Sequence, residues 1–149
     1  MRRGIPLLLV VAFVGCATPY QSTGALGGYS STKLGPRLYQ VRFAGNGFTS
    51  NDRASEFILR RAAELALENN FRYFTLGDQQ SLITPAGGYR MPTVGKPTQS
   101  MMVRFLDSEK DDPAAVDAAT VVKETDAQTN GALSELARKN LIKLIGGKP

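Results

Sequence analysis

The chain has 149 residues, a formal net charge of +5 at neutral pH, one cysteine and no histidine. This composition excludes histidine as a general base, zinc sites built from several nitrogen or sulfur ligands, and a disulfide within the chain. The positive charge is mild and spread along the sequence, whereas nucleic-acid-binding domains gather it on one face, so we expect no nucleic-acid partner.

The first sixteen residues are typical of a secretory signal. Two arginines precede an apolar run over residues 5–14, and Gly15 then leads to Cys16. The run is shorter than the about 20 residues of a membrane-spanning helix but fits the about 7–15 of a signal peptide. The pattern predicts a signal peptide over residues 1–15, with Cys16 as the first mature residue. A plain secreted protein with an ordinary cleavage site is the alternative.

The stretch Phe13-Val14-Gly15-Cys16 resembles the lipobox of bacterial lipoproteins, with Phe13 in the place where leucine is usual. The resemblance implies that the Cys16 sulfur carries a diacylglycerol and that its freed amine is acylated. Aspartate after the cysteine commonly retains such proteins in the inner membrane, and Ala17 stands there instead. The resemblance therefore implies a lipid-anchored protein of the cell envelope, on the periplasmic face of the outer membrane.

Residues 16–36 are rich in glycine, serine, threonine and proline and hold few large apolar side chains. Such a composition buries too little surface to offset the entropy of ordering. We expect a flexible tether of about 25 Å average span between the acylated Cys16 and the folded domain.

The domain is predicted over residues 37–124. Tyr39, Val41 and Phe43 alternate with more polar neighbours, which predicts a strand with one buried face over residues 37–43. The glycines of residues 45–47 predict a turn, for which the alternative is an anion-binding loop.

A helix is predicted from about residue 51 to residue 69, with Thr49 or Ser50 as its cap. Ala54, Ile58 and Leu65 fall on its apolar stripe, whereas Phe57 falls on the mostly polar face. A second strand is predicted over residues 71–76, completing a strand, helix, strand crossover.

The second half of the domain is less regular. Residues 79–99 contain several prolines and glycines and are interpreted as a loop or an extended hairpin tip. A third strand is predicted over residues 101–106, followed by an acidic turn and a short helical stretch from Pro113 to about Lys123. The acidic turn holds Asp107, Glu109, Asp111 and Asp112; a solvated turn is favoured over a calcium site, because the EF-hand spacing is missing, and no metal is expected.

Residues 125–149 are predicted to form a polar spacer and a C-terminal amphipathic helix, whose apolar stripe holds Leu133, Leu136, Ala137, Leu141 and Leu144. The stripe can dock on the chain's own domain, lie on an anionic membrane or pair with a partner. Docking on the domain is favoured because most such stripes belong to a core.

Four residues are candidates for a contact surface. Arg61 can form ion pairs with Glu64 and Glu68 that cover the edge of the helix, or recognise a ligand. Phe57 is expected to be an exposed aromatic among charges, and Tyr89 and Arg90 lie in the proline- and glycine-rich segment, which is long enough to serve as a contact loop.

The runs Gly28-Tyr29-Ser30, Arg61-Ala62-Ala63-Glu64-Leu65 and Tyr73-Phe74 resemble a family of small, uncharacterised bacterial envelope lipoproteins typified by Caulobacter members. The resemblance covers about residues 16–77. It supplies no catalytic residue.

The sequence thus predicts an α+β fold in one small domain, with a strand, helix, strand, strand core and a C-terminal amphipathic helix. The expected function is that of a noncatalytic accessory, structural or protein-binding subunit of the envelope, without a cofactor. A periplasmic module that binds a small ligand or cell-wall glycan is the alternative, and an enzyme is not expected.

Overall fold

The computed structural model describes residues 17–25, 27–86, 94–127, 129, 131 and 133–146, and over residues 78–86 and 94–97 it describes the backbone alone. These residues form one mixed α+β domain, which confirms the predicted fold class. The elements in chain order are β1 (Gly28–Lys33), β2 (Leu38–Ala44), α1 (Asn51–Glu68), β3 (Tyr73–Ala86), β4 (Val94–Leu106), the short 3-10 helix η1 (Glu109–Asp111), β5 (Val116–Asp117), α2 (Ala118–Glu124) and α3 (Glu135–Gly146).

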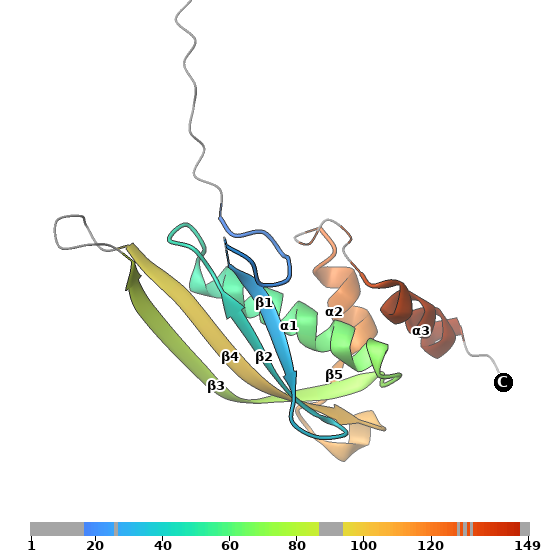
Figure 1. Cartoon of the computed structure of the whole chain (residues 1–149). Coiled ribbons are helices and arrows are strands. Elements are labelled where there is room, and N and C mark those ends of the chain that lie inside the picture. Colours follow the sequence, from blue (N-terminus) through green and yellow to red (C-terminus); the bar gives the residue numbers. More distant parts are fainter. Residues whose placement is uncertain are drawn as a thin grey trace, which may run out of the picture.

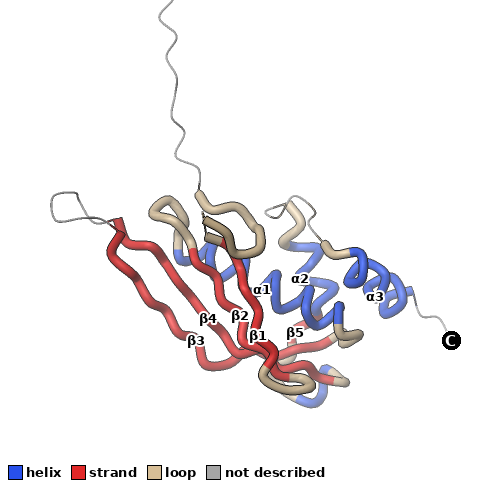
Figure 2. Tube along the Cα trace, in the orientation of Figure 1, coloured by secondary structure: helices blue, strands red, loops and turns tan. Residues whose placement is uncertain are grey.

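The five strands form one antiparallel sheet in the order β1-β2-β4-β3-β5 (Figures 1 and 2). Because β2 and β3 each pair antiparallel with β4, they run parallel to each other, and α1 crosses from one to the other. The predicted crossover unit is therefore present, with β4 inserted between its two strands.

Local interactions set both ends of helix α1. The Ser50 hydroxyl accepts a hydrogen bond from the backbone N–H of Arg53 at 3.2 Å, which caps the first turn. At the other end Asn70 adopts a left-handed conformation, with φ of 63°, and stops the helix. The predicted bounds of this helix differ from the observed ones by a single residue.

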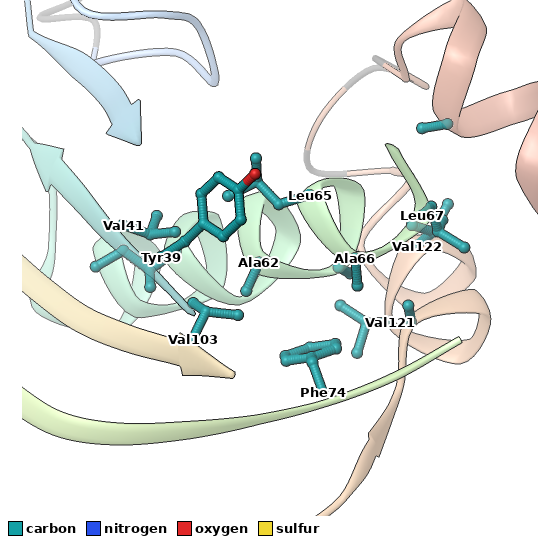
Figure 3. Packing of buried hydrophobic residues seen from close by; sticks show 14 of the residues in the cluster. Tyr39, Val41, Ala62, Leu65, Ala66, Leu67, Phe74, Val103, Val121 and Val122 are labelled. Atoms are coloured by element: carbon teal, nitrogen blue, oxygen red, sulfur yellow. The ribbon is translucent and has the colours of Figure 1, made fainter. Parts of the chain in front are cut away.

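The core lies between the sheet and α1 (Figure 3). The alternation predicted for β2 holds, since Tyr39, Val41 and Phe43 point to the buried face. Residues of β3 and β4 extend this face, and α2 closes the far end of α1. The labelled members of the cluster are Tyr39, Val41, Ala62, Leu65, Ala66, Leu67, Phe74, Val103, Val121 and Val122.

Within the segment over residues 79–99, the described residues 79–86 and 94–99 belong to two long paired strands, which supports the extended hairpin of the two interpretations. β3 and β4 stay paired from Tyr73↔Leu106 to Ala86↔Val94, with a register shift between Gly77 and Gln80. Thr98 is the β4 residue nearest the hairpin tip that pairs with β2. Between Thr98 and Val94, β4 pairs with β3 alone, so this part of the hairpin is a two-stranded ribbon. A ribbon leaves one edge of each strand without a neighbouring strand, which is where a sheet tolerates proline.

One further prediction differs from the structure. The helix predicted from Pro113 begins only at Ala118, where the Asp117 carboxylate caps it by accepting from the backbone of Ala119 at 2.8 Å. Before it lie η1 and the two-residue β5. Two acidic residues of this turn form ion pairs with strand or turn arginines, Asp107 with Arg37 and Asp112 with Arg104.

The prediction of a flexible tether over residues 16–36 is wrong for its described part, residues 17–25 and 27–36, which is ordered against the domain. β1 pairs with β2 from Gly28↔Ala44 to Lys33↔Tyr39, and Thr18 is fully buried. The Tyr20 ring packs against Tyr29, with ring centroids 4.8 Å apart. Backbone pairing with β2 and close packing at glycines order this segment, and neither requires many apolar side chains.

Helix α3 docks on α1, the favoured one of its three readings. Ala137 is fully buried, and the Asn140 side-chain amide donates to the Leu67 carbonyl at 2.7 Å. Ser134, just before the helix, donates to Glu68 Oε1 at 2.8 Å.

Candidate functional site

A polar hollow of about 490 Å³ opens where the N-terminal segment, β1, α1 and the start of α3 meet. Its walls are contributed by segments far apart in the sequence. The lining residues are Tyr20, Tyr29, Arg61, Glu64, Glu68, Leu133 and Ser134. It is the site in the described part of the chain where charged and aromatic side chains converge most clearly.

Arg61 lies at the centre of this polar hollow. Its Nε donates to Ser31 Oγ at 3.1 Å, Nη1 contacts Glu64 Oε2 at 3.1 Å, and both terminal nitrogens contact Glu68 at 3.2 and 3.3 Å. The guanidinium also lies 5.0 Å from the centre of the Tyr29 ring, a cation–π arrangement. Burial acts to lower the pKa of Arg61, but the Glu68 and Glu64 carboxylates outweigh it and raise that pKa above its ordinary value.

Glu64 is the buried acceptor that joins several segments. Its carboxylate accepts from the Tyr20 hydroxyl at 2.6 Å, from Arg60 Nε at 3.0 Å and from Arg61 Nη1 at 3.1 Å. Burial first, and the neighbouring Glu64 charge second, raise the pKa of Tyr20 far above its ordinary value. Burial also raises the pKa of Tyr29, against the opposing charge of Arg61. Both phenols therefore stay protonated at neutral pH, and the Tyr20 hydroxyl serves as a hydrogen-bond donor to Glu64.

Arg60 extends this network to the other side of α1. Its side chain is fully buried, and besides Glu64 it donates to the Val122 carbonyl, to Thr125 Oγ1 at 3.2 Å and toward Asp126 at 3.6 Å. Helical periodicity alone places Arg60 opposite the apolar stripe of α1, but its side chain is buried because α2 and the turn after it cover that face. The spacing of Arg60 and Glu64 by four residues was the available signal.

The hollow offers paired charges, hydrogen-bond donors and aromatic ring faces. Each carboxylate is paired with a guanidinium, Glu64 with those of Arg60 and Arg61 and Glu68 with that of Arg61. The arginines and tyrosines can donate hydrogen bonds, and the tyrosine rings offer faces for stacking. Among the described residues, no three histidine, cysteine, aspartate or glutamate side chains gather in a way that could hold a metal ion.

A second feature is an apolar groove of about 420 Å³ between α2 and α3, here named the α2–α3 groove. It is lined by Ala119, Val122, Lys123, Asp126, Gly131, Leu133, Arg138, Leu141 and Ile145. Ile145 is 60% exposed and Ile142, one turn earlier on α3, is 66% exposed. Lys123 and Arg138 bring two positive charges to the groove against the single negative charge of Asp126, so its apolar surface has a basic rim.

Of the four predicted contact residues, the structure describes Arg61 and Phe57. Arg61 forms the expected ion pairs with Glu64 and Glu68. The prediction for Phe57 is wrong: its side chain is fully buried, 5.1 Å from the Phe43 ring and 5.3 Å from the Tyr20 ring. The N-terminal segment covers the helix face on which Phe57 lies. Tyr89 and Arg90 lie outside the described residues, as does Cys16.

The turn over residues 45–47 is held by its own side chains. Asn46 Oδ1 accepts from the Phe48 backbone at 3.0 Å and from the Thr49 hydroxyl at 3.1 Å. Both bonds stay within the loop, which supports the turn over the anion-binding alternative.

No helix in the described part of the chain combines the length and the apolar character needed to cross a bilayer. No protein-family model matches the sequence, and neither a curated protein nor a solved structure is significantly similar to it.

Proposed function

We propose that this chain is a lipid-anchored protein of the cell envelope and a noncatalytic accessory or structural subunit that binds a protein partner. The observation that carries the proposal is the apolar run that ends at Gly15-Cys16, directly after a basic N-terminus. Acylation of Cys16 attaches the domain to the membrane, and two or three acyl chains hold it there almost permanently. Ala17 favours the periplasmic face of the outer membrane.

The α2–α3 groove supports binding of a protein partner. Ile142 and Ile145 are exposed side by side on α3, next to the apolar wall made by Val122 and Leu141. Covering the exposed part of each isoleucine is worth about 1–2 kcal/mol. The basic rim selects a partner segment that combines apolar and acidic side chains.

Photocrosslinking in growing cells tests this assignment. A photoreactive phenylalanine analogue at Ile142 is expected to give one discrete adduct with an envelope protein, and I145D is expected to abolish it. The matched control places the same analogue at Leu34, which is 52% exposed in the turn between β1 and β2. The same set of adducts from both positions contradicts a specific partner at the groove.

The membrane assignment has its own measurement. Cells fed labelled palmitate are expected to label the wild-type chain but not C16A, and the labelled protein should sediment with the outer membrane in a density gradient. Recovery in the inner-membrane fraction contradicts the outer-membrane location. An unlabelled wild-type chain contradicts the anchor itself.

A small-ligand or glycan-binding module is the second candidate, and the polar hollow is the observation that favours it. Tyr20 and Tyr29 line it beside Arg61 and Glu68, a combination suited to a sugar that carries a charged peptide. Titration with soluble cell-wall muropeptides, followed by nuclear magnetic resonance, should shift the resonances around Tyr29 in the wild type and not in Y29A. Unchanged spectra in the wild type contradict this candidate.

A further inference from the structure

The N-terminal segment is fastened to the loop that joins β2 to α1. The Thr18 backbone N–H donates to Thr49 Oγ1 at 3.1 Å, and Thr18 Oγ1 accepts from the Asn46 backbone at 2.8 Å. Thr18 is fully buried by these contacts. Figure 1 shows the first described residues leaving the fold at the same end of the molecule as this loop.

The proposed lipid attachment site lies only two residues before this clamp. Two residues of extended chain span at most about 7 Å, compared with the about 25 Å average of a twenty-residue tether. The headgroup layer on one side of a bilayer is about 5–8 Å thick. A lipid on Cys16 therefore brings the Thr18 clamp and its loop to the membrane surface.

The surface presented at this end suits that position. Residues 17–32 and 43–51 contain no charged side chain; the charges that flank them are Lys33 and Arg42 and, at the start of α1, Asp52. At the tip of the β2–α1 loop, Phe48 is 68% exposed, next to the clamped Thr49. An apolar aromatic ring at the tip of an uncharged loop is favoured at the boundary between headgroups and acyl chains, whereas charged side chains are costly deeper in the bilayer.

We propose that the β2–α1 loop is a second membrane contact, with the Phe48 side chain entering the interfacial layer of the bilayer to which Cys16 is anchored. This inference rests on the proposed lipid attachment at Cys16. The anchor and the ring together fix the orientation of the domain, so that the β2–α1 loop faces the membrane and the β1–β2 turn faces away. A single anchor on a long tether would leave the domain free to rotate.

Tryptophan fluorescence tests the contact without interference, because the chain contains no tryptophan. The full-length acylated F48W protein is reconstituted into vesicles of phosphatidylethanolamine and phosphatidylglycerol, with and without brominated acyl chains. The matched control is L34W, which lies beyond the opposite end of β2, about 20 Å along the strand. The mass of the N-terminal peptide is measured on the same samples to establish acylation of Cys16.

The expected result is a blue-shifted emission of F48W that brominated lipids quench strongly, and an emission of L34W that they leave unchanged. Acylated protein in which F48W is quenched no more than L34W overturns the membrane contact and leaves the anchor intact. A Cys16 without lipid in the wild-type chain overturns the anchor and, with it, this inference.

Discussion

Arg60 shows how one residue couples three parts of the chain. It is the largest fully buried side chain among the described residues, and its guanidinium reaches Glu64 on its own helix, the Val122 carbonyl in α2 and Thr125 after it. A buried ion pair gives little net stability compared with apolar packing, because both charges lose their hydration. Removing only one partner of the pair nevertheless destabilises the fold strongly, because the charge of the other partner stays buried.

We expect R60M to lose about 3–5 kcal/mol of the free energy of unfolding, because the buried Glu64 loses one of its two guanidinium partners and the Val122 carbonyl loses its donor. Urea unfolding of the chain from Ala17 onward measures the loss. R53M is the matched control, since Arg53 lies exposed in the first turn of the same helix. Similar losses in the two variants would contradict a special role for the buried guanidinium.

Ionisation of Tyr20 lowers the free energy of unfolding at alkaline pH. Its pKa is raised in the folded state by burial first and by Glu64 second, so the folded state holds the phenolic proton more tightly than the unfolded state. This contribution is complete below the unfolded pKa of about 10 and falls as pH rises above it, by about 1.4 kcal/mol per pH unit.

The variant Y20F removes the titrating group and is expected to flatten the decline of unfolding free energy above pH 10. It also costs about 1–3 kcal/mol at neutral pH, because Glu64 loses a donor. Y73F serves as the control, since Tyr73 lies outside the polar hollow. A decline in Y20F as steep as in the wild type would show that other groups govern the alkaline transition.

At the scale of elements, the N-terminal segment is ordered by the close approach of backbones. Gly27 has φ of +97°, and a Cβ there would lie 2.2 Å from the Ala44 carbonyl oxygen. Gly24, in the same segment, has nothing within 4 Å of such a Cβ. Glycine is thus required at position 27, whereas position 24 has room for a larger residue.

We therefore expect G27A to destabilise the domain by clearly more than about 1 kcal/mol, through both the positive φ and the clash. G24A should change the free energy of unfolding by less than about 1 kcal/mol in either direction. Chemical denaturation of both variants measures the difference. Equal effects would mean that the segment does not pack against β2 as described.

These elements also show what the sequence could predict. The 3.6-residue period fixed α1 to within one residue, and alternation located β2, because each element has one strongly apolar face. β1 was missed because its order comes from backbone pairing with β2 and from glycines that allow close contact. The extension of β3 and β4 was masked by prolines that a two-stranded ribbon tolerates.

The candidate site was harder to foresee than the fold. Arg61, Glu64 and Glu68 share one helix, so their spacing indicated the ion pairs. The contributions of Tyr20, Tyr29 and Ser134 depend on tertiary contacts over large sequence separations, which no local pattern records. Phe57 was misplaced for the same reason.

For the whole molecule, α1 is the central element. The sheet packs on one side of it, α2 and α3 lie against it elsewhere, and the N-terminal segment covers the rest near Phe57. Surrounding a helix in this way buries charged positions such as Arg60 and Glu64, which a helix packed on a sheet alone would leave in water. α3 is the outermost layer, attached through α1 and carrying exposed apolar residues.

Deletion of residues 130–149 should therefore lower the melting temperature but leave a folded domain. Three partly buried leucines, Leu133, Leu141 and Leu144, are lost at about 1 kcal/mol each, which corresponds to roughly 10 °C. The sheet, α1 and α2 keep their shared core, so unfolding should stay cooperative. Deletion of residues 147–149 alone is the control and should leave the melting temperature unchanged. A melting temperature unaffected by the longer deletion would refute docking of α3, whereas loss of cooperative unfolding would make α3 part of the core itself.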